Sequence, residues 1–123
     1  MAMRIGTIFP GSGRFCLAFV LLLLYGGHAL AALPVYTITI TDGVYSPASI
    51  KVPPGQRFKI IIKNTGKGPA EFENLALRVE KVLAPEVESF VVIHPLKPGN
   101  YHFIDEFHLD MSGFAIVVTE PKN

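Results

Sequence analysis

Apolar and polar side chains alternate along several short segments of the chain from residue 35 onward. In residues 35–41 (VYTITIT) apolar positions alternate with threonines, and in residues 57–64 (RFKIIIKN) every second residue from Phe58 to Ile62 is apolar. A period of two is typical of a β-strand with one face on a core. We therefore expect the following side chains to face the core: Tyr36, Ile38, Ile40, Phe58, Ile60 and Ile62.

Turn-forming residues separate these segments from further strand-like ones. Glycine, proline, asparagine and aspartate cluster at residues 42–43, 53–55, 64–69 and 97–100, and these residue types favour turns. Strand patterns also occur in residues 44–52, 75–83, 87–93, 101–104 and 114–119. About seven short strands at this spacing predict an all-β fold, a Greek-key β-sandwich.

Residues 70–84 (AEFENLALRVEKVLA) allow two interpretations. Glutamate, leucine, alanine, arginine and lysine are good helix formers, which favours a helix. Leu75, Leu77 and Val79 nevertheless alternate as they would in a strand,. We adopt the strand for residues 75–83.

The first 32 residues have the pattern of a cleaved secretory signal. Arg4 and Arg14 are followed by an apolar run over residues 15–25, and Ala29–Leu30–Ala31 provides small residues at a cleavage site,. An uncleaved membrane anchor is the alternative, but the run is shorter than the roughly 20 residues that span a bilayer. We expect a cleaved signal peptide at residues 1–32, a single domain at residues 33–123, and a periplasmic location.

The expected domain has no thiol, because the one cysteine, Cys16, lies in the signal. Its stability then depends on packing rather than a disulfide, and no thiolate is available to bind a metal. Residues 33–123 contain nine basic and ten acidic side chains, with no basic patch. This charge balance gives no indication of nucleic-acid binding.

The most unusual segment is the acidic, histidine-bearing stretch at residues 101–113 (YHFIDEFHLDMSG). If the strand that begins at Tyr101 continues in register, Tyr101, Phe103 and Asp105 point to the same, inward face. An inward carboxylate is costly unless it is hydrogen-bonded or bound to a cation. His108 and Met111 follow three and six residues later, so three potential ligands converge where two strands meet.

Residues 101–118 (YHFIDEFHLDMSGFAIVV) resemble the end of cupredoxins, in which an aromatic strand leads to a cysteine, a histidine, a methionine and the last strand. In this resemblance Asp105 stands at the cysteine position, while His108 and Met111 stand at the histidine and methionine positions. The upstream histidine position falls on Glu73. The motifs EFEN, LRVEKV, PLKPG and EFH are similar to those of the EfeO-type cupredoxin-like domains.

The EfeO-type resemblance covers nearly the whole expected domain. It implies a cupredoxin fold in a small periplasmic protein associated with ferrous-iron uptake, with a site rebuilt from carboxylate and imidazole. The partners it implies are a metal ion and an inner-membrane iron permease or another periplasmic iron-binding protein.

The resemblance implies an iron ion, and the ligand chemistry leaves copper as a second candidate. A blue-copper centre needs a cysteine, whereas carboxylate and imidazole suit Fe(II), Mn(II), Zn(II) or Cu(II), and a thioether suits Cu(I). Asp105 and Glu106 compete for one inward position, and Met111 also suits a core position. Glu71, Glu80 and Asp110 are expected to be solvated. The candidate metal ligands are Glu73, Asp105, Glu106, His108 and Met111.

Two functions remain open at this point. The first is a periplasmic cupredoxin-fold protein with a non-blue metal site, accessory to iron or copper uptake by binding, transferring or helping to oxidise Fe(II). The second is a metal-free periplasmic protein-interaction module of the same fold. No serine–histidine–aspartate or cysteine–histidine arrangement supports hydrolase chemistry, so the sequence favours a binding protein and leaves a redox role open.

Overall fold

The computed structural model describes residue 6 and residues 32–123. Within this part, nine β-strands and one short 3-10 helix form in the unit Leu33–Asn123. The predicted signal peptide lies outside the described residues, apart from residues 6 and 32. No helix in the described part is long and apolar enough to cross a membrane.

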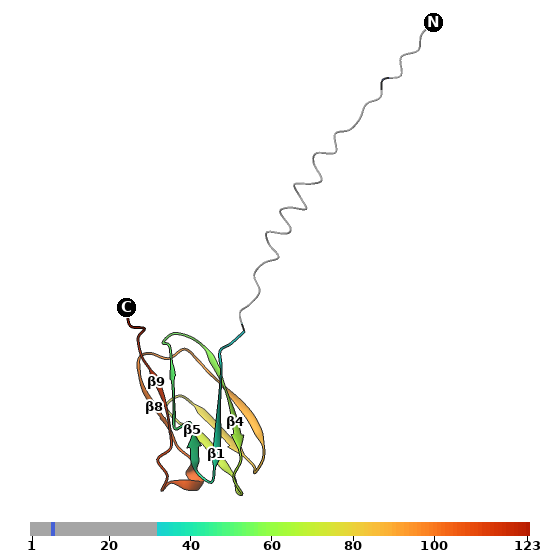
Figure 1. The fold of residues 1–123 in the computed structure, drawn as a ribbon, viewed down its shortest axis with the longest axis vertical. Helices are drawn as coiled ribbons and strands as arrows, with labels where there is room; N and C mark the ends of the chain where they lie inside the picture. Colours follow the sequence, from blue (N-terminus) through green and yellow to red (C-terminus); the bar gives the residue numbers. More distant parts are fainter. Residues whose placement is uncertain (1–5, 7–31) are drawn as a thin grey trace. The chain divides into compact units, whose positions relative to one another are not determined.

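The strands form three sheets that enclose one core (Figure 1). The sheet orders are β2-β1-β4-β7, β3-β9-β8 and β5-β6. The all-β sandwich predicted from the sequence is confirmed, with nine strands in place of about seven. The elements are β1 (Val35–Thr41), β2 (Val44–Ser46), β3 (Ser49–Val52), β4 (Phe58–Asn64), β5 (Ala70–Asn74), β6 (Val79–Leu83), β7 (Glu88–Ile93), β8 (Gly99–Phe103), β9 (Phe114–Val118) and the 3-10 helix η2 (Glu106–His108).

Two predicted strands have different bounds in the structure. The segment at residues 44–52 divides into β2, which pairs with β1, and β3, which pairs with β9. The strand predicted over residues 75–83 was wrong in its first half, because β5 ends at Asn74 and a turn precedes β6. That turn begins with the Asn74 side chain, whose Oδ1 accepts a hydrogen bond from the Leu77 backbone N–H at 2.9 Å, a role that favours asparagine in turns.

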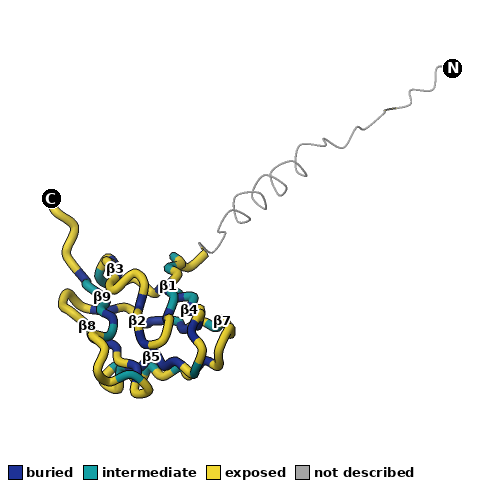
Figure 2. Tube along the Cα trace, turned by 60° about the horizontal axis from the view of Figure 1, so that its bottom comes forward, coloured by how far each residue is buried: buried dark blue, intermediate teal, exposed yellow. Residues whose placement is uncertain are grey.

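The core joins the sheets through apolar side chains at alternate strand positions. Figure 2 shows buried residues within the strands. Five of the six side chains expected in the core are buried, and the sixth, Tyr36, packs partly buried against them. Aromatic rings from β5, β8 and β9 pack together in the core. The centroids of the stacked Phe72 and Phe103 rings lie 4.1 Å apart, and those of Phe72 and Phe114 lie 5.6 Å apart. Such contacts contribute beyond the area they bury.

Strand β5 is fixed against the chain that leaves β8. The Glu73 N–H donates to the Ile104 carbonyl at 3.1 Å, and the Ile104 N–H donates to the Glu73 carbonyl at 3.0 Å. This single antiparallel bridge lies outside the named strands. It brings β5 alongside the segment that enters η2.

The tight turn between β1 and β2 packs against the loop that follows η2. Asp42 and Gly43 both have positive φ, 48° and 87°, as in the two-residue turns typical of β-hairpins. A Cβ atom at Gly43 would lie 2.5 Å from the His108 Cβ and 2.9 Å from the Met111 Cγ. Glycine is therefore needed here both for its backbone conformation and for close approach.

We expect Gly43→Ala to destabilise the fold more than Gly55→Ala, the matched control. Gly55 also has positive φ, 72°, but no atom lies within 4 Å of its Cβ position. Left-handed backbone strain costs about 1–2 kcal/mol in both variants, and overpacking adds about 1–3 kcal/mol at Gly43 alone. Urea unfolding of the three proteins measures the difference, and equal losses would contradict the packing of the turn on this loop.

Candidate metal centre

Strand β5 presents two glutamates on one face. Glu71 and Glu73 are two residues apart and are only 4% and 5% exposed. Phe72, between them, points to the opposite face and packs in the core, as the alternation of a strand requires. The expectation that Glu71 is solvated was wrong, because it belongs to β5, which packs against η2.

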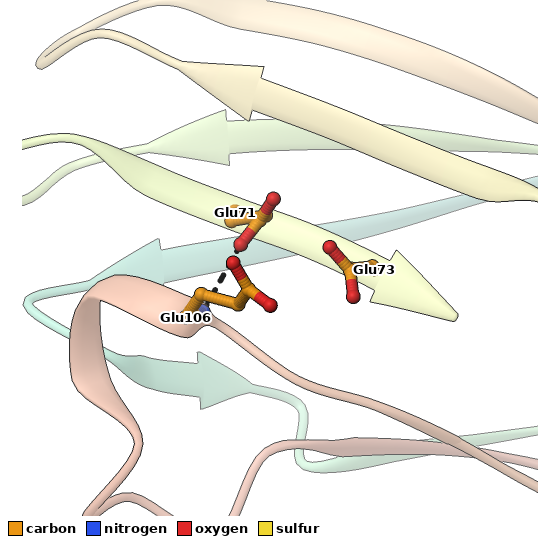
Figure 3. A group of neighbouring side chains, drawn as sticks. All are labelled: Glu71, Glu73 and Glu106. Atoms are coloured by element: carbon orange, nitrogen blue, oxygen red, sulfur yellow. Dashed lines mark hydrogen bonds between the residues drawn. The ribbon is translucent and has the colours of Figure 1, made fainter. Parts of the chain in front are cut away.

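Glu106 approaches these glutamates from η2. Its backbone N–H donates a hydrogen bond to Glu71 Oε2 at 3.1 Å. One carboxylate oxygen from each of Glu71, Glu73 and Glu106 lies within 4.8 Å of the others, and Figure 3 shows the three side chains gathered between β5 and η2. We call these three residues the carboxylate cluster. Glu106 is exposed, so the cluster opens to solvent on the η2 side.

The carboxylate cluster concentrates negative charge without a basic neighbour. Among the described residues, the ion pairs are Lys63–Glu88 and His108–Asp105, neither of which includes a member of the cluster. Burial raises the pKa of Glu73 above its ordinary value, and the negative charges of Glu106 and Glu71 raise it further. Such a group favours a proton or a bound cation, which removes the repulsion.

Asp105 and His108 form a separate pair beside the cluster. Asp105 is 2% exposed and faces inward, as its alternation with Phe103 predicts. Its Oδ2 lies 3.0 Å from His108 Nδ1, and its Oδ1 accepts a hydrogen bond from the Phe107 N–H at 2.9 Å. His108 is partly exposed. Of the two residues expected to compete for one inward position, Asp105 points inward and Glu106 points outward.

Met111 lies in the loop after η2 and is 38% exposed, so the interpretation that it fills the core was wrong. The Met111 N–H donates to the His108 carbonyl at 3.1 Å, which closes a turn and brings both side chains against Gly43. The thioether therefore remains accessible from solvent.

Tyr45 connects β2 to the strand that carries the glutamates. It is buried, and its hydroxyl donates a hydrogen bond to the Glu71 backbone carbonyl. Burial and the negative charges of Asp105 and Glu71 raise the pKa of Tyr45, so the phenol keeps the proton that it donates. This bond ties β2 to the backbone of β5.

The structure brings the five predicted ligands into two groups. Glu73 and Glu106 join the carboxylate cluster with Glu71, while Asp105 and His108 pair with each other and Met111 lies on Gly43 with His108. The sequence reasoning missed Glu71. The signal that would have revealed it is the spacing of two in AEFEN, which places Glu71 and Glu73 on one face once β5 is recognised as a strand,.

The raised pKa of Glu73 predicts how stability depends on pH in the metal-free protein. The folded state keeps a proton on Glu73 at pH values where the unfolded chain, with a pKa near 4.5, has lost it. The free energy of unfolding should therefore fall as pH rises above 4.5 towards the raised pKa,. Denaturant unfolding in the presence of a chelator, over a series of pH values, measures this slope.

The variant Glu73→Gln should flatten that slope and raise stability at neutral pH, because it removes the charge that the cluster repels. Glu120→Gln is the matched control, since Glu120 is an exposed carboxylate outside the cluster. If Glu73→Gln and the wild type show the same pH dependence, the repulsion inferred for the cluster is absent.

Comparisons with known proteins agree with the fold. Residues 14–117 match the family model described as "Cupredoxin-like domain". An uncharacterized protein of Rickettsia prowazekii (strain Madrid E) is 37% identical over 81 residues, and the match covers 65% of each chain. The chain thus spans about two thirds of that relative. None of these matches bears an EfeO-type name, so that finer assignment remains a prediction.

Solved structures share the fold at low sequence identity. Reduced auracyanin of Roseiflexus castenholzii has a TM-score of 0.58 at 15% identity, covering 72% of this chain and 99% of that one. The metal-binding domain of the Cu(I)-exporting P-type ATPase CopA of Streptococcus pneumoniae D39, solved with Cu(I), has a TM-score of 0.59 at 18% identity, covering 70% and 85%. With nine strands in a sandwich and a family match over most of its length, the chain belongs to the cupredoxin-like domain family.

Proposed function

We propose that this protein is an exported cupredoxin that binds an iron ion through carboxylates and delivers it to an uptake system. The observation that carries the proposal is the carboxylate cluster: Glu71, Glu73 and Glu106 offer three oxygens within 4.8 Å of one another, and two of the three side chains are buried. No lysine or arginine in the described part of the chain neutralises them by an ion pair. A cation that binds there relieves the repulsion that raises the pKa of Glu73,.

The donor set favours a hard cation over a soft one. Carboxylate oxygens suit Fe(II), Fe(III) and Mn(II), whereas thiolates and thioethers suit Cu(I). Residues 33–123 contain no cysteine, so the cupredoxin fold lacks the thiolate of a blue-copper centre. Oxidation of Fe(II) would need a separate electron acceptor, and the proposal concerns binding and transfer of the ion.

The cellular part of the proposal comes from the sequence. The apolar run at residues 15–25 and the small residues at 29–31 support export to the periplasm,. The EfeO-type motifs support delivery to an inner-membrane iron permease or another periplasmic iron-binding protein. The half-open cluster, with Glu106 on the solvent side, suits an ion that must be released again.

Copper is the second candidate ion, and a specific observation favours it. His108 and Met111 both lie against Gly43, and both are accessible to solvent. Imidazole with a thioether is a donor set that suits Cu(I). The metal-binding domain of CopA from Streptococcus pneumoniae, which shares the fold, was solved with Cu(I).

A metal-free interaction module is the alternative from a different functional class. It is favoured by exposed apolar side chains around the acidic loop, namely Leu75, Ile104, Phe107 and Leu109. Exposed apolar residues beside charged ones are typical of surfaces that contact partner proteins. Such a module would purify without metal and would not respond to added ions.

Anaerobic calorimetric titration with Fe(II) tests the iron proposal. We expect Glu71→Gln and Glu73→Gln each to weaken Fe(II) binding at least as much as loss of an outer-shell partner does, roughly 10- to 100-fold. Affinity should also fall as pH drops, because Glu73 must release its proton to bind,. Glu120→Gln is the matched control and should bind as the wild type does.

Two results would separate the rival functions. Loss of Cu(I) binding in His108→Ala and Met111→Ala, with Fe(II) binding absent from the wild type, would assign the site to copper. Absence of both ions from the purified protein, with no heat on titration of either, would contradict metal binding and favour the interaction module.

A further inference from the structure

We infer that Asp105 is a positioning residue, not a metal ligand: it holds the His108 imidazole by Nδ1 and leaves Nε2 as the nitrogen that binds a cation. The role of His108 as a ligand rests on the second candidate under the proposed function, a copper ion held by His108 and Met111. The inference also changes the predicted ligand set, in which Asp105 stood among the donors.

Both oxygens of Asp105 are already engaged by donors from the chain. Oδ1 accepts the Phe107 backbone N–H at 2.9 Å, and Oδ2 lies 3.0 Å from His108 Nδ1. The side chain is 1% exposed. Each oxygen keeps a second lone pair, but the carboxylate is buried, so a metal that bound Asp105 would have to enter the protein beside both of these partners.

The Asp105 carboxylate selects one form of the histidine ring. An ionised carboxylate only accepts hydrogen bonds, so the hydrogen between the two groups belongs to Nδ1 of His108. In a neutral imidazole the lone pair then lies on Nε2, which is the nitrogen able to bind a metal. A carboxylate that holds a histidine in this way fixes its tautomer and ring orientation and raises its basicity as a ligand.

Two further contacts keep the ring in this orientation. The His108 backbone N–H donates to the Asp105 carbonyl at 2.9 Å, which closes the single turn of η2. The Cβ and Cγ atoms of His108 pack against Gly43, where even one added carbon would meet them at 2.5 and 2.7 Å. The imidazole is therefore fixed at its Nδ1 edge by Asp105 and at its base by Gly43, and His108 is partly exposed to solvent.

Nitrogen-15 NMR of the imidazole tests this directly in the metal-free protein, purified from cells that express the whole chain. Long-range proton–nitrogen correlations distinguish a protonated ring nitrogen from an unprotonated one. At a pH where His108 is neutral, we expect Nδ1 to be protonated and Nε2 unprotonated. The opposite tautomer in the wild type would overturn the inference, whatever the protein binds.

The variant Asp105→Asn should reverse the tautomer. Its one amide oxygen can accept the Phe107 N–H, and its NH₂ group then faces Nδ1, which must become the acceptor. Asp110→Asn is the matched control, because Asp110 is an exposed acid in the same loop, and it should leave the tautomer unchanged. If Asp105→Asn does not fold, the wild-type spectrum alone decides between the two tautomers.

Titration with Zn(II), a diamagnetic probe, links the tautomer to binding. We expect Zn(II) to shift the Nε2 resonance of His108 and leave Nδ1 protonated, and we expect Asp105→Asn to weaken this binding roughly 10- to 100-fold. Zn(II) bound at Nδ1 would overturn the inference. A protein that has the expected tautomer but binds neither Zn(II) nor Cu(I) would support the positioning role and contradict the copper site proposed at His108 and Met111, so the two failures are distinguishable.

Discussion

The site depends on the two backbone hydrogen bonds between Glu73 and Ile104, at 3.1 and 3.0 Å. They set the register of β5 against the segment that enters η2. The register decides which of the two faces of the strand each side chain points to. In the observed one, Phe72 stacks on Phe103 in the core while Glu71 and Glu73 face η2. A shift by one residue would place both carboxylates in the aromatic core and expose the phenylalanine.

This register places the mutually repelling carboxylates on one face of β5 and the stacked aromatic ring of Phe72 on the other. The carboxylate cluster repels itself, as the raised pKa of Glu73 indicates, and nothing in the described part of the chain offsets it with an ion pair. The aromatic rings beneath β5 and the Tyr45 hydrogen bond to Glu71 hold the strand regardless. Locally unfavourable features of this kind, held in place by the surrounding structure, are expected at functional sites.

The sequence predicted what depends on local periodicity and failed where partners come from distant segments. Alternation identified the core positions of β1 and β4, and the inward direction of Asp105, because a strand's two faces follow from its own residues. Glu71 was missed because its burial depends on η2, 35 residues away. The hairpin of β5 and β6 was missed because helix-forming residues obscured its short strands and the turn at Asn74.

The location of the proposed site follows from what replaces cysteine in the cupredoxin pattern. In the resemblance to cupredoxins Asp105 stands at that position, and a buried carboxylate there must satisfy two oxygens rather than one sulfur. The chain provides one partner for each oxygen, the Phe107 N–H and the His108 ring, and the second of these contacts fixes the imidazole. The acidic groups left to bind a cation are then those whose oxygens face one another across β5 and η2, namely Glu71, Glu73 and Glu106. Without a thiolate at Asp105 the domain has no donor for a copper–thiolate bond, and the proposed site therefore depends on the neighbouring carboxylates.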